Sequence, residues 1–148
     1  MKQRVTLSQI EIFLREADQL FPIPLSCRQD LTAYAKKLYE KATLCVACVD
    51  EEIVSMVAGY TENVPDACGY IAIVATLPKA ERKGLASRLV KEFITICERK
   101  NLKAVHLYAV PDNVPAINMY AALGFRELQI ADEPRKEDAH LIYYLEEV

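Results

Sequence analysis

Apolar residues recur with a helical period in several segments of the chain, and shorter apolar runs separate these segments. Spacings of three and four residues predict helices over residues 7–20, 28–41 and 85–99. A fourth helix is expected between a cap at Asn113 and a stop at Gly124, since these residue types favour those positions. Helices therefore occupy the N-terminal part and the middle of the chain.

Apolar runs typical of β-strands lie between and after these helices. The run over residues 68–77 is apolar at nearly every position, so we expect it at the centre of a sheet. Its connection to residues 104–109 passes through a helix, which makes those two strands parallel. The pattern predicts an α/β fold (an α+β mixed sheet, mostly antiparallel) with helices on both faces. The other expected strands are residues 43–49, 53–60, 125–130 and 141–145.

Composition limits the class of protein. The chain has 148 residues, of which 52% are hydrophobic and 26% charged, with a formal net charge of −3. These values are typical of a single globular domain, expected here over residues 1–148, and the charge indicates no nucleic-acid partner. No segment has the length and apolarity of a membrane helix or a signal peptide. We therefore expect a cytoplasmic protein without a membrane partner.

The cysteines and histidines do not suggest a disulfide framework or a metal site. The cysteine count of five is odd, and Cys45 and Cys48 fall in one strand, where an offset of three places them on opposite faces. His106 and His140 stand alone in the sequence, outside any metal-ligand spacing. We expect no metal and interpret His106 as a satisfied core residue more readily than as a base.

A basic turn precedes the helix at residues 85–99. Its cations are Lys79, Arg82, Lys83 and Arg88. The N-terminus of a helix carries a partial positive charge and favours acidic neighbours, so an anion such as phosphate would stabilise this arrangement. Gly84 would let a ligand approach the backbone closely. A solvated basic helix face explains the same cations, and both interpretations stay open.

The same turn resembles a motif of a known enzyme family. Gly84 and Ala86 match the pattern [QR]-x-x-G-x-[GA], the acetyl-CoA-binding motif of the GNAT superfamily of N-acetyltransferases. Glu81 occupies the position where the family has Gln or Arg, which is a departure from the pattern. Arg82, one residue later, offers a cation in place of the missing one.

A second motif strengthens this resemblance. Residues 113–125 match N-x-x-A-x-x-x-Y-x-x-x-G-F, which resembles the last helix of the GNAT family. Together the two motifs extend the resemblance over roughly residues 43–130. The resemblance implies a GNAT-like fold, in which the two parallel strands splay apart, and an acetyl-CoA-dependent N-acetyltransferase that transfers the acetyl group directly to an amine.

The resemblance also implies where acetyl-CoA, the expected cosubstrate, binds. The central strand would pair with the pantetheine arm, and a backbone N–H of this strand would stabilise the oxyanion. The N–H groups of the basic turn would hold the pyrophosphate. The expected binding residues are Val74, Ala75, Thr76, Arg82, Lys83, Gly84, Leu85, Ala86, Ser87, Asn113 and Ala116.

Tyr120 is the catalytic residue that the family implies, as the general acid that protonates the departing CoA thiolate. A core aromatic packed near the sheet is the alternative for Tyr120, and a simple helix cap is the alternative for Asn113. No general base is evident, because residues 69–77 contain no carboxylate. Glu62 and Asp66 in the preceding loop are the nearest candidates, and a solvated loop charge is the simpler interpretation of each.

The acceptor is expected to bind between the first two helices and the hairpin loops. Phe21 and Arg28, with Glu62, are the candidate substrate-binding residues, and Arg28 would either meet a substrate carboxylate or cap its own helix. We expect a small-molecule amine and a monomer or homodimer, the latter through a free strand edge at residues 141–145. A catalytically weak CoA-binding or interaction domain with the same fold is the alternative function.

Overall fold

The computed structural model describes residues 5–21, 23–135 and 137–146, and within them it contains one mixed sheet of six strands in the order β1-β2-β3-β4-β6-β5. Only β3 and β4 pair in parallel, which confirms the expected α/β fold. The strands are β1 (Thr43–Val49), β2 (Glu52–Tyr60), β3 (Cys68–Thr76), β4 (Ala104–Ala109), β5 (Arg126–Glu127) and β6 (Ala139–Tyr144). The helices are α1 (Leu7–Ala17), α2 (Leu31–Lys41), α3 (Leu85–Arg99) and α4 (Val114–Leu123).

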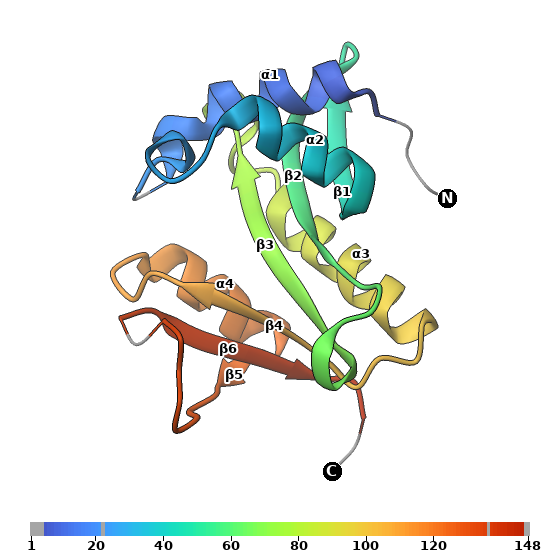
Figure 1. The fold of residues 1–148 in the computed structure, drawn as a ribbon. Helices are drawn as coiled ribbons and strands as arrows, with labels where there is room; N and C mark the ends of the chain where they lie inside the picture. Colours follow the sequence, from blue (N-terminus) through green and yellow to red (C-terminus); the bar gives the residue numbers. More distant parts are fainter. Residues whose placement is uncertain (1–4, 22, 136, 147–148) are drawn as a thin grey trace.

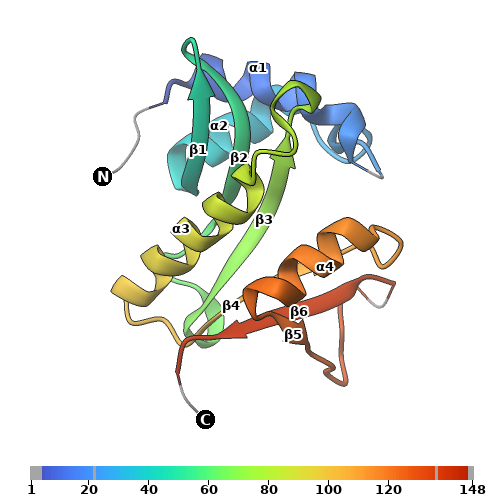
Figure 2. The ribbon, with the colours of Figure 1, turned by 180° about the vertical axis from the view of Figure 1, so that it is seen from behind.

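Helices cover both faces of the sheet, but unevenly. Figure 1 shows α1 and α2 against one face of β1, β2 and β3, and Figure 2 shows α3 and α4 together against the other face. The face of β4 and β6 that is turned away from α4 carries no helix of the described chain (Figure 1). This uncovered face leaves room for polar side chains beside the sheet.

Two apolar cores hold the layers together. The core under α3 and α4 includes the fully buried Leu89, Val90 and Phe93. The core under α1 and α2 includes the fully buried Phe13 and Leu38. Helices α1, α2 and α3 each bury one apolar stripe, which is the pattern that a 3.6-residue period predicts, whereas α4 is apolar on most of its surface.

The two parallel strands separate after a short paired stretch. Cys68–Ile71 of β3 pairs with Ala104–Leu107 of β4, and β3 then continues to Thr76 with β2 as its only partner in the described chain. At this point Gly59 of β2 pairs with Ile71 while Ala58 pairs with Ile73, so Ala72 is an extra residue in β3. Such a bulge bends its strand and twists it further. The splay implied by the family resemblance is therefore present.

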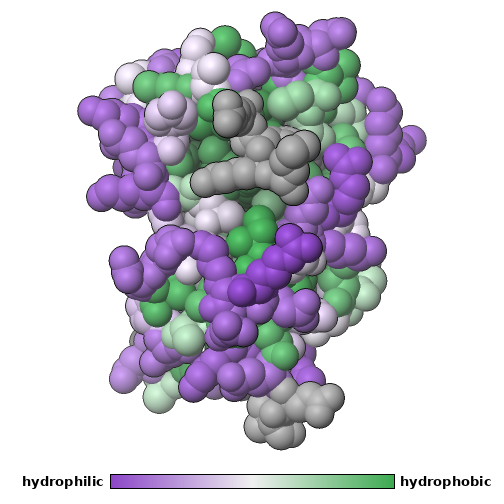
Figure 3. All heavy atoms as spheres, turned by 90° about the vertical axis from the view of Figure 1, so that its right-hand side faces the viewer, coloured by the Kyte–Doolittle hydropathy of each residue, from purple (hydrophilic) through white to green (hydrophobic). Residues whose placement is uncertain are grey.

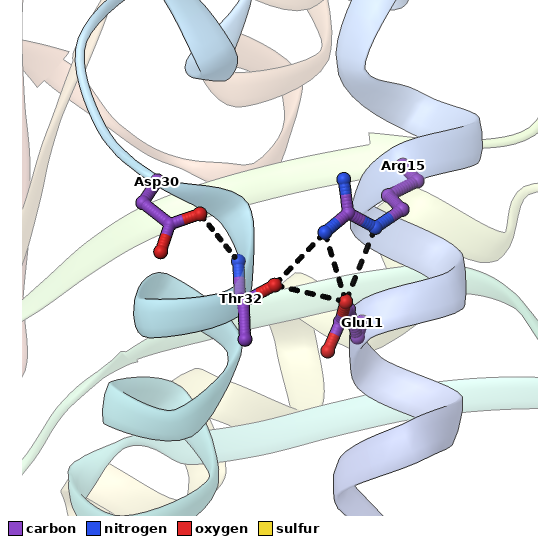
Figure 4. A network of polar contacts seen from close by, with 4 residues as sticks. All are labelled: Glu11, Arg15, Asp30 and Thr32. Carbon is purple, nitrogen blue, oxygen red and sulfur yellow. Dashed lines mark hydrogen bonds and ion pairs between the residues drawn. The ribbon is translucent and has the colours of Figure 1, made fainter.

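The connection between α1 and α2 is held by polar contacts at both ends. Asp18 accepts hydrogen bonds from the backbone N–H and the hydroxyl of Ser26, at 2.9 and 2.5 Å. Figure 4 shows how Arg15 and Thr32 both donate to the carboxylate of Glu11, which joins the two helices. These contacts fix the segment that carries Phe21 and Arg28.

Several expected element boundaries need correction. The helix expected at residues 28–41 begins only at Leu31, because Asp30 caps it by accepting from the backbone N–H of Thr32. The strand expected at 125–130 is reduced to Arg126–Glu127, since Gln129 and the residues after it leave the sheet. Residues 141–142 are not a free edge, because β5 pairs with them there.

Figure 3 shows one side of the molecule, where hydrophilic residues predominate and hydrophobic ones emerge in small separate areas. None of the helices in the described residues has the length and apolarity needed to span a bilayer. Cys45 is buried and Cys48 is exposed, as an offset of three residues along one strand allows.

Candidate active site

A cavity of about 440 Å³ opens where β3 and β4 diverge. Its walls come from both faces of the sheet. Ala86 and Tyr120 reach it from α3 and α4, and Phe21 and Arg28 reach it from the α1–α2 connection. The cavity therefore passes between the two strands and joins the two sides of the sheet.

About half of the residues expected to bind acetyl-CoA line the cavity. Those that line it are Val74, Ala75, Thr76, Ala86, Asn113 and Ala116. Beyond Ile71, β3 has no partner on its β4 side in the described chain, so its backbone groups on that side are open to a ligand. The remaining expected residues, Arg82, Lys83, Gly84, Leu85 and Ser87, belong to the turn and first residues of α3, outside the lining.

The N-terminus of α3 is built as an anion site would be. Its cap residue Gly84 is left-handed (φ 70°), makes no side-chain cap bond and is followed by no acidic residue in the first turn. Arg82 is also left-handed (φ 66°), a conformation that lets successive N–H groups form a concave anion nest. The first-turn N–H groups are thus left for a ligand or water.

The cations of this turn differ in whether they form an ion pair. Arg82, Lys83 and Arg88 are exposed and form no ion pair with any described residue. Lys79 instead binds Glu52 of β2 over 2.7 Å. Lys79 thus already has an acidic partner, whereas the other three cations of the turn have none among the described residues.

Tyr120 lies on α4, with its ring 5% exposed and packed edge-on against Phe125. It lines the cavity, and no described residue hydrogen-bonds to its hydroxyl. Burial raises the pKa of Tyr120 above its usual value, so the group stays protonated at neutral pH. Tyr120 is thus a core aromatic residue, as the alternative from the sequence had it, and it also lines the cavity; its role as general acid stays a prediction.

Asn113 caps α4, since its side-chain oxygen accepts from the backbone N–H of Ala116 at 3.4 Å. It also lines the cavity. The cap alternative raised by the sequence is therefore realised, and contact with pantetheine stays a prediction.

Where the acceptor is expected to bind, the cavity combines apolar and charged residues. Phe21 and Arg28 line it as expected, and they are joined by Tyr108, Arg135 and Asp138, which the sequence did not single out. The guanidinium of Arg135 lies over the Tyr108 ring, 5.2 Å from its centre, and 3.8 Å from the Asp138 carboxylate.

The two carboxylates considered as bases lie elsewhere. Glu62 is exposed and forms an ion pair with Lys100 at the end of α3. Asp66 is exposed in a short turn before β3. Neither lines the cavity, so the structure brings neither of them to the expected site.

A polar network on the uncovered face of β4 and β6 is the feature that sequence reasoning missed. Glu133 accepts from the Tyr108 hydroxyl at 2.5 Å and lies 2.7 Å from His140 Nδ1. His140 Nε2 in turn lies 2.8 Å from His106 Nδ1. The histidines, which look separate in the sequence, are thus partners. A signal existed: His106 and Tyr108 are two residues apart in one strand, so they share a face.

Burial and the contacts within this network shift the pKa values of three of its members. The hydrogen bond from Tyr108, supported by the one with His140, lowers the pKa of Glu133 below its usual range. Burial, with a contribution from Glu133, raises the pKa of Tyr108 to about 12. Burial and the neighbouring His140 lower the pKa of His106. At neutral pH the network therefore contains a charged Glu133 and a protonated Tyr108.

Relatives with curated names match only part of the chain. The mycothiol acetyltransferase of Arthrobacter sp. (strain FB24) is 39% identical over 59 residues, which are 40% of this chain and 18% of that protein. The mycothiol acetyltransferase of Pseudarthrobacter chlorophenolicus is 34% identical over 73 residues, which are 48% of this chain and 23% of that protein. The matched region thus spans about a fifth of the length of these relatives.

Solved structures match nearly the whole chain. Ard1 from Thermoplasma volcanium has a TM-score of 0.78 at 19% identity, over 98% of this chain and 97% of its own. An acetyltransferase of the GNAT family from Staphylococcus aureus Mu50 has a TM-score of 0.77 at 13% identity, over 99% and 98%. The PaiA N-acetyltransferase of Thermoplasma acidophilum, solved in complex with coenzyme A, has a TM-score of 0.71 at 11% identity, over 96% of each chain.

These likenesses establish the fold, and the family follows from the sequence itself. The model of the acetyltransferase (GNAT) family matches residues 11–125, which is most of the chain and includes both motifs. The chain belongs to the GNAT family of acetyltransferases.

Proposed function

We propose that this protein transfers the acetyl group of acetyl-CoA directly to the primary amine of a small molecule. One observation carries the proposal: a single cavity between β3 and β4 is lined by Ala86 of α3 and Tyr120 of α4 from one face of the sheet and by polar residues such as Arg28 and Tyr108 from the other. The donor can therefore enter from one face of the sheet and the acceptor from the other, and the two can meet between β3 and β4.

The residues present fit acetyl-CoA as the donor. Arg82, Lys83 and the open N–H groups after Gly84 suit a pyrophosphate, because cations and helix N-termini both stabilise phosphate oxygens. The free side of β3 from Val74 to Thr76 suits an amide-bearing arm, which would add to the sheet like a strand. Acetyl-CoA supplies the activated thioester.

Tyr120 has the properties of the general acid. Transfer forms a bond between the amine nitrogen and the acetyl carbon and breaks the bond from that carbon to sulfur. The departing sulfur needs a proton, and the protonated hydroxyl of Tyr120 is available on the cofactor side. A neutral tyrosine places no charge in the cavity before it donates that proton, and the tyrosinate that it becomes regains a proton as the nitrogen loses one on amide formation.

The acceptor is proposed to be a small molecule. The whole cavity, which must also admit the reactive end of the donor, is about 440 Å³. Its acceptor side is confined by Phe21 and Arg28 on one wall and by Tyr108 and Arg135 on another. The mycothiol acetyltransferases similar to this chain bear a name that fits a small-molecule acceptor, although the match covers a minor part of them.

Thermal unfolding with acetyl-CoA tests the donor, with ATP as the control for general phosphate binding. Saturation at about 100 times the Kd is expected to stabilise the protein by about 2.7 kcal/mol, which is a shift of several degrees. A panel of amines, followed by release of the CoA thiol, then tests transfer. A shift without thiol release from any amine would favour a CoA-binding domain over an enzyme, and no shift at millimolar acetyl-CoA would contradict the proposal.

A further inference from the structure

Glu133 is the centre of a chain of hydrogen bonds that reaches the cavity through Tyr108. Its two carboxylate oxygens contact the Tyr108 hydroxyl at 2.5 Å and His140 Nδ1 at 2.7 Å. Because an ionised carboxylate only accepts hydrogen bonds, both neighbours donate to it. The other ring nitrogen of His140 lies 2.8 Å from His106 Nδ1, so the two histidines are also partners. The two bonds to Glu133 thus have a defined direction.

Because the Tyr108 hydroxyl donates its proton to Glu133, it can only accept a hydrogen bond from a molecule in the cavity. A tyrosine has one hydroxyl proton, and in Tyr108 this proton is committed to Glu133. The oxygen can therefore only accept a hydrogen bond from a second partner. A bound amine or ammonium group donates N–H and suits this site, whereas a carboxylate or carbonyl oxygen does not.

Tyr108 also lies on the face of the sheet from which the acceptor is proposed to enter. Its neighbour Leu107 packs into the core under α3 and α4, to which Tyr120 also belongs. Successive residues of a strand face opposite sides, so Tyr108 faces away from that core. Tyr108 and Tyr120 both line the cavity. One tyrosine thus belongs to the donor side and the other to the acceptor side.

We propose that Tyr108 and Glu133 form the proton-accepting arm of acetyl transfer, with His140 and His106 as positioning residues. Before the nitrogen attacks, an N–H bond of the bound ammonium ion breaks and its proton joins Tyr108 Oη, which frees the nitrogen lone pair to bond to the acetyl carbon. In the same step the Tyr108 proton passes to Glu133 Oε1, which leaves a neutral tyrosine and a carboxylic acid. Glu133 later releases this proton to solvent. The inference rests on the proposed function, because acetyl transfer is the reaction that this arm serves.

The surroundings of Tyr108 suit a concerted transfer. The rings of His140, His106 and Tyr70 lie 4.4, 6.2 and 6.3 Å from its ring, and Arg135 covers one face. A free tyrosinate is unfavourable in this partly buried setting, so the hydroxyl must gain one proton as it loses the other. The carboxylate of Glu133, with its side chain 13% exposed, stands next to the hydroxyl as the final acceptor.

Two amines of similar shape but different basicity test the arm. At pH 7 ethylamine is an ammonium ion that must lose a proton, whereas 2,2,2-trifluoroethylamine is largely neutral already. Tyr108→Phe and Glu133→Gln are each expected to lower kcat/KM for ethylamine by at least about tenfold and to affect trifluoroethylamine much less. Glu133→Asp, which keeps the charge, is expected to recover part of the loss.

Control variants separate this role from a structural one. Tyr39→Phe and Glu137→Gln alter exposed residues outside the cavity and are expected to leave both rates unchanged. All variants are expected to keep the thermal shift with acetyl-CoA, which shows that they fold and bind the donor. Equal losses for both amines, or no loss, would overturn the inference while wild-type transfer stands. A wild-type protein that neither binds acetyl-CoA nor acetylates any amine would instead overturn the proposed function.

Discussion

Gly59 and Tyr70 approach each other so closely at the bulge between β2 and β3 that a Cβ atom on Gly59 would lie 2.1 Å from the Tyr70 carbonyl oxygen. The same atom would lie 2.8 Å from the ring of Phe93 in α3. This contact occurs where β3 leaves β4 and the cavity begins. The shape of the candidate site therefore depends on a glycine that has no chemical role in it.

Gly59→Ala is expected to destabilise the protein by about 1–3 kcal/mol or more, because the obstructing atom belongs to the backbone and cannot rotate away. Urea unfolding measures the change. Gly69→Ala is the comparison, since its closest contact is the side-chain sulfur of Cys97, at 2.7 Å, which can adjust. Equal losses in the two variants would contradict this account of the bulge.

Tyr120→Phe is expected to reduce turnover at least tenfold, since the departing sulfur loses its proton donor. The ring packs against Phe125 in both proteins, so the thermal shift with acetyl-CoA should barely change. Release of the CoA thiol with an active amine measures the rate, and the exposed Tyr39→Phe serves as control. Unchanged turnover would leave Tyr120 a packing residue only.

The cations before α3 are expected to contribute unequally to donor binding. Arg82→Ala combined with Lys83→Ala should weaken acetyl-CoA by roughly tenfold or more, because charge-assisted contacts to phosphate contribute about 1.5–3 kcal/mol each in favourable cases. Lys79→Ala should change the Kd little, since Lys79 already binds Glu52. Calorimetry at two salt concentrations measures both effects. A larger loss from Lys79→Ala would show that its pair with Glu52 gives way to the ligand.

The stability of the protein is expected to fall as the pH drops from 7 toward 5, with His106 as one cause. Burial lowers the pKa of His106 below its usual 6.5, so the unfolded chain binds a proton at this residue more readily than the folded protein does. Protonation in this window therefore favours unfolding. In His106→Gln the free energy of unfolding should fall less between these pH values, as chemical unfolding would show. An identical slope in both proteins would exclude this residue as a source.

Local patterns in the sequence identify most of the fold. The helix over residues 85–99 and the strand over 104–109 match α3 and β4 residue for residue, because periodicity and flanking turns mark both ends. Between them, Asn101 is left-handed (φ 60°), a conformation that commonly follows the end of a helix. The strand expected at 125–130 was too long, because the point where a chain leaves a sheet depends on its neighbours. Pairing of Arg126 and Glu127 with β6 is such a tertiary property.

Some residues of the candidate site can likewise be identified from a local motif, whereas others come together only through tertiary pairing. Tyr120 and Asn113 belong to a contiguous motif on one helix, so their spacing alone places both near the cavity. The proton-accepting arm joins residues from β4, a loop and β6, and it depends on the register that sets Tyr108 opposite His140. No single segment contains that information. Likewise, the pairing of Lys79 with Glu52 depends on the contact between β2 and the turn after β3.

The passage between β3 and β4 has a kinetic consequence. In the proposed reaction, donor and acceptor reach the reacting atoms from opposite faces of the sheet, so neither would block the route of the other. Both would then be bound at once, and we expect that either can bind first. The enzyme should then show intersecting rather than parallel double-reciprocal plots, and CoA and the acetylated amine should depart by separate exits in no fixed sequence.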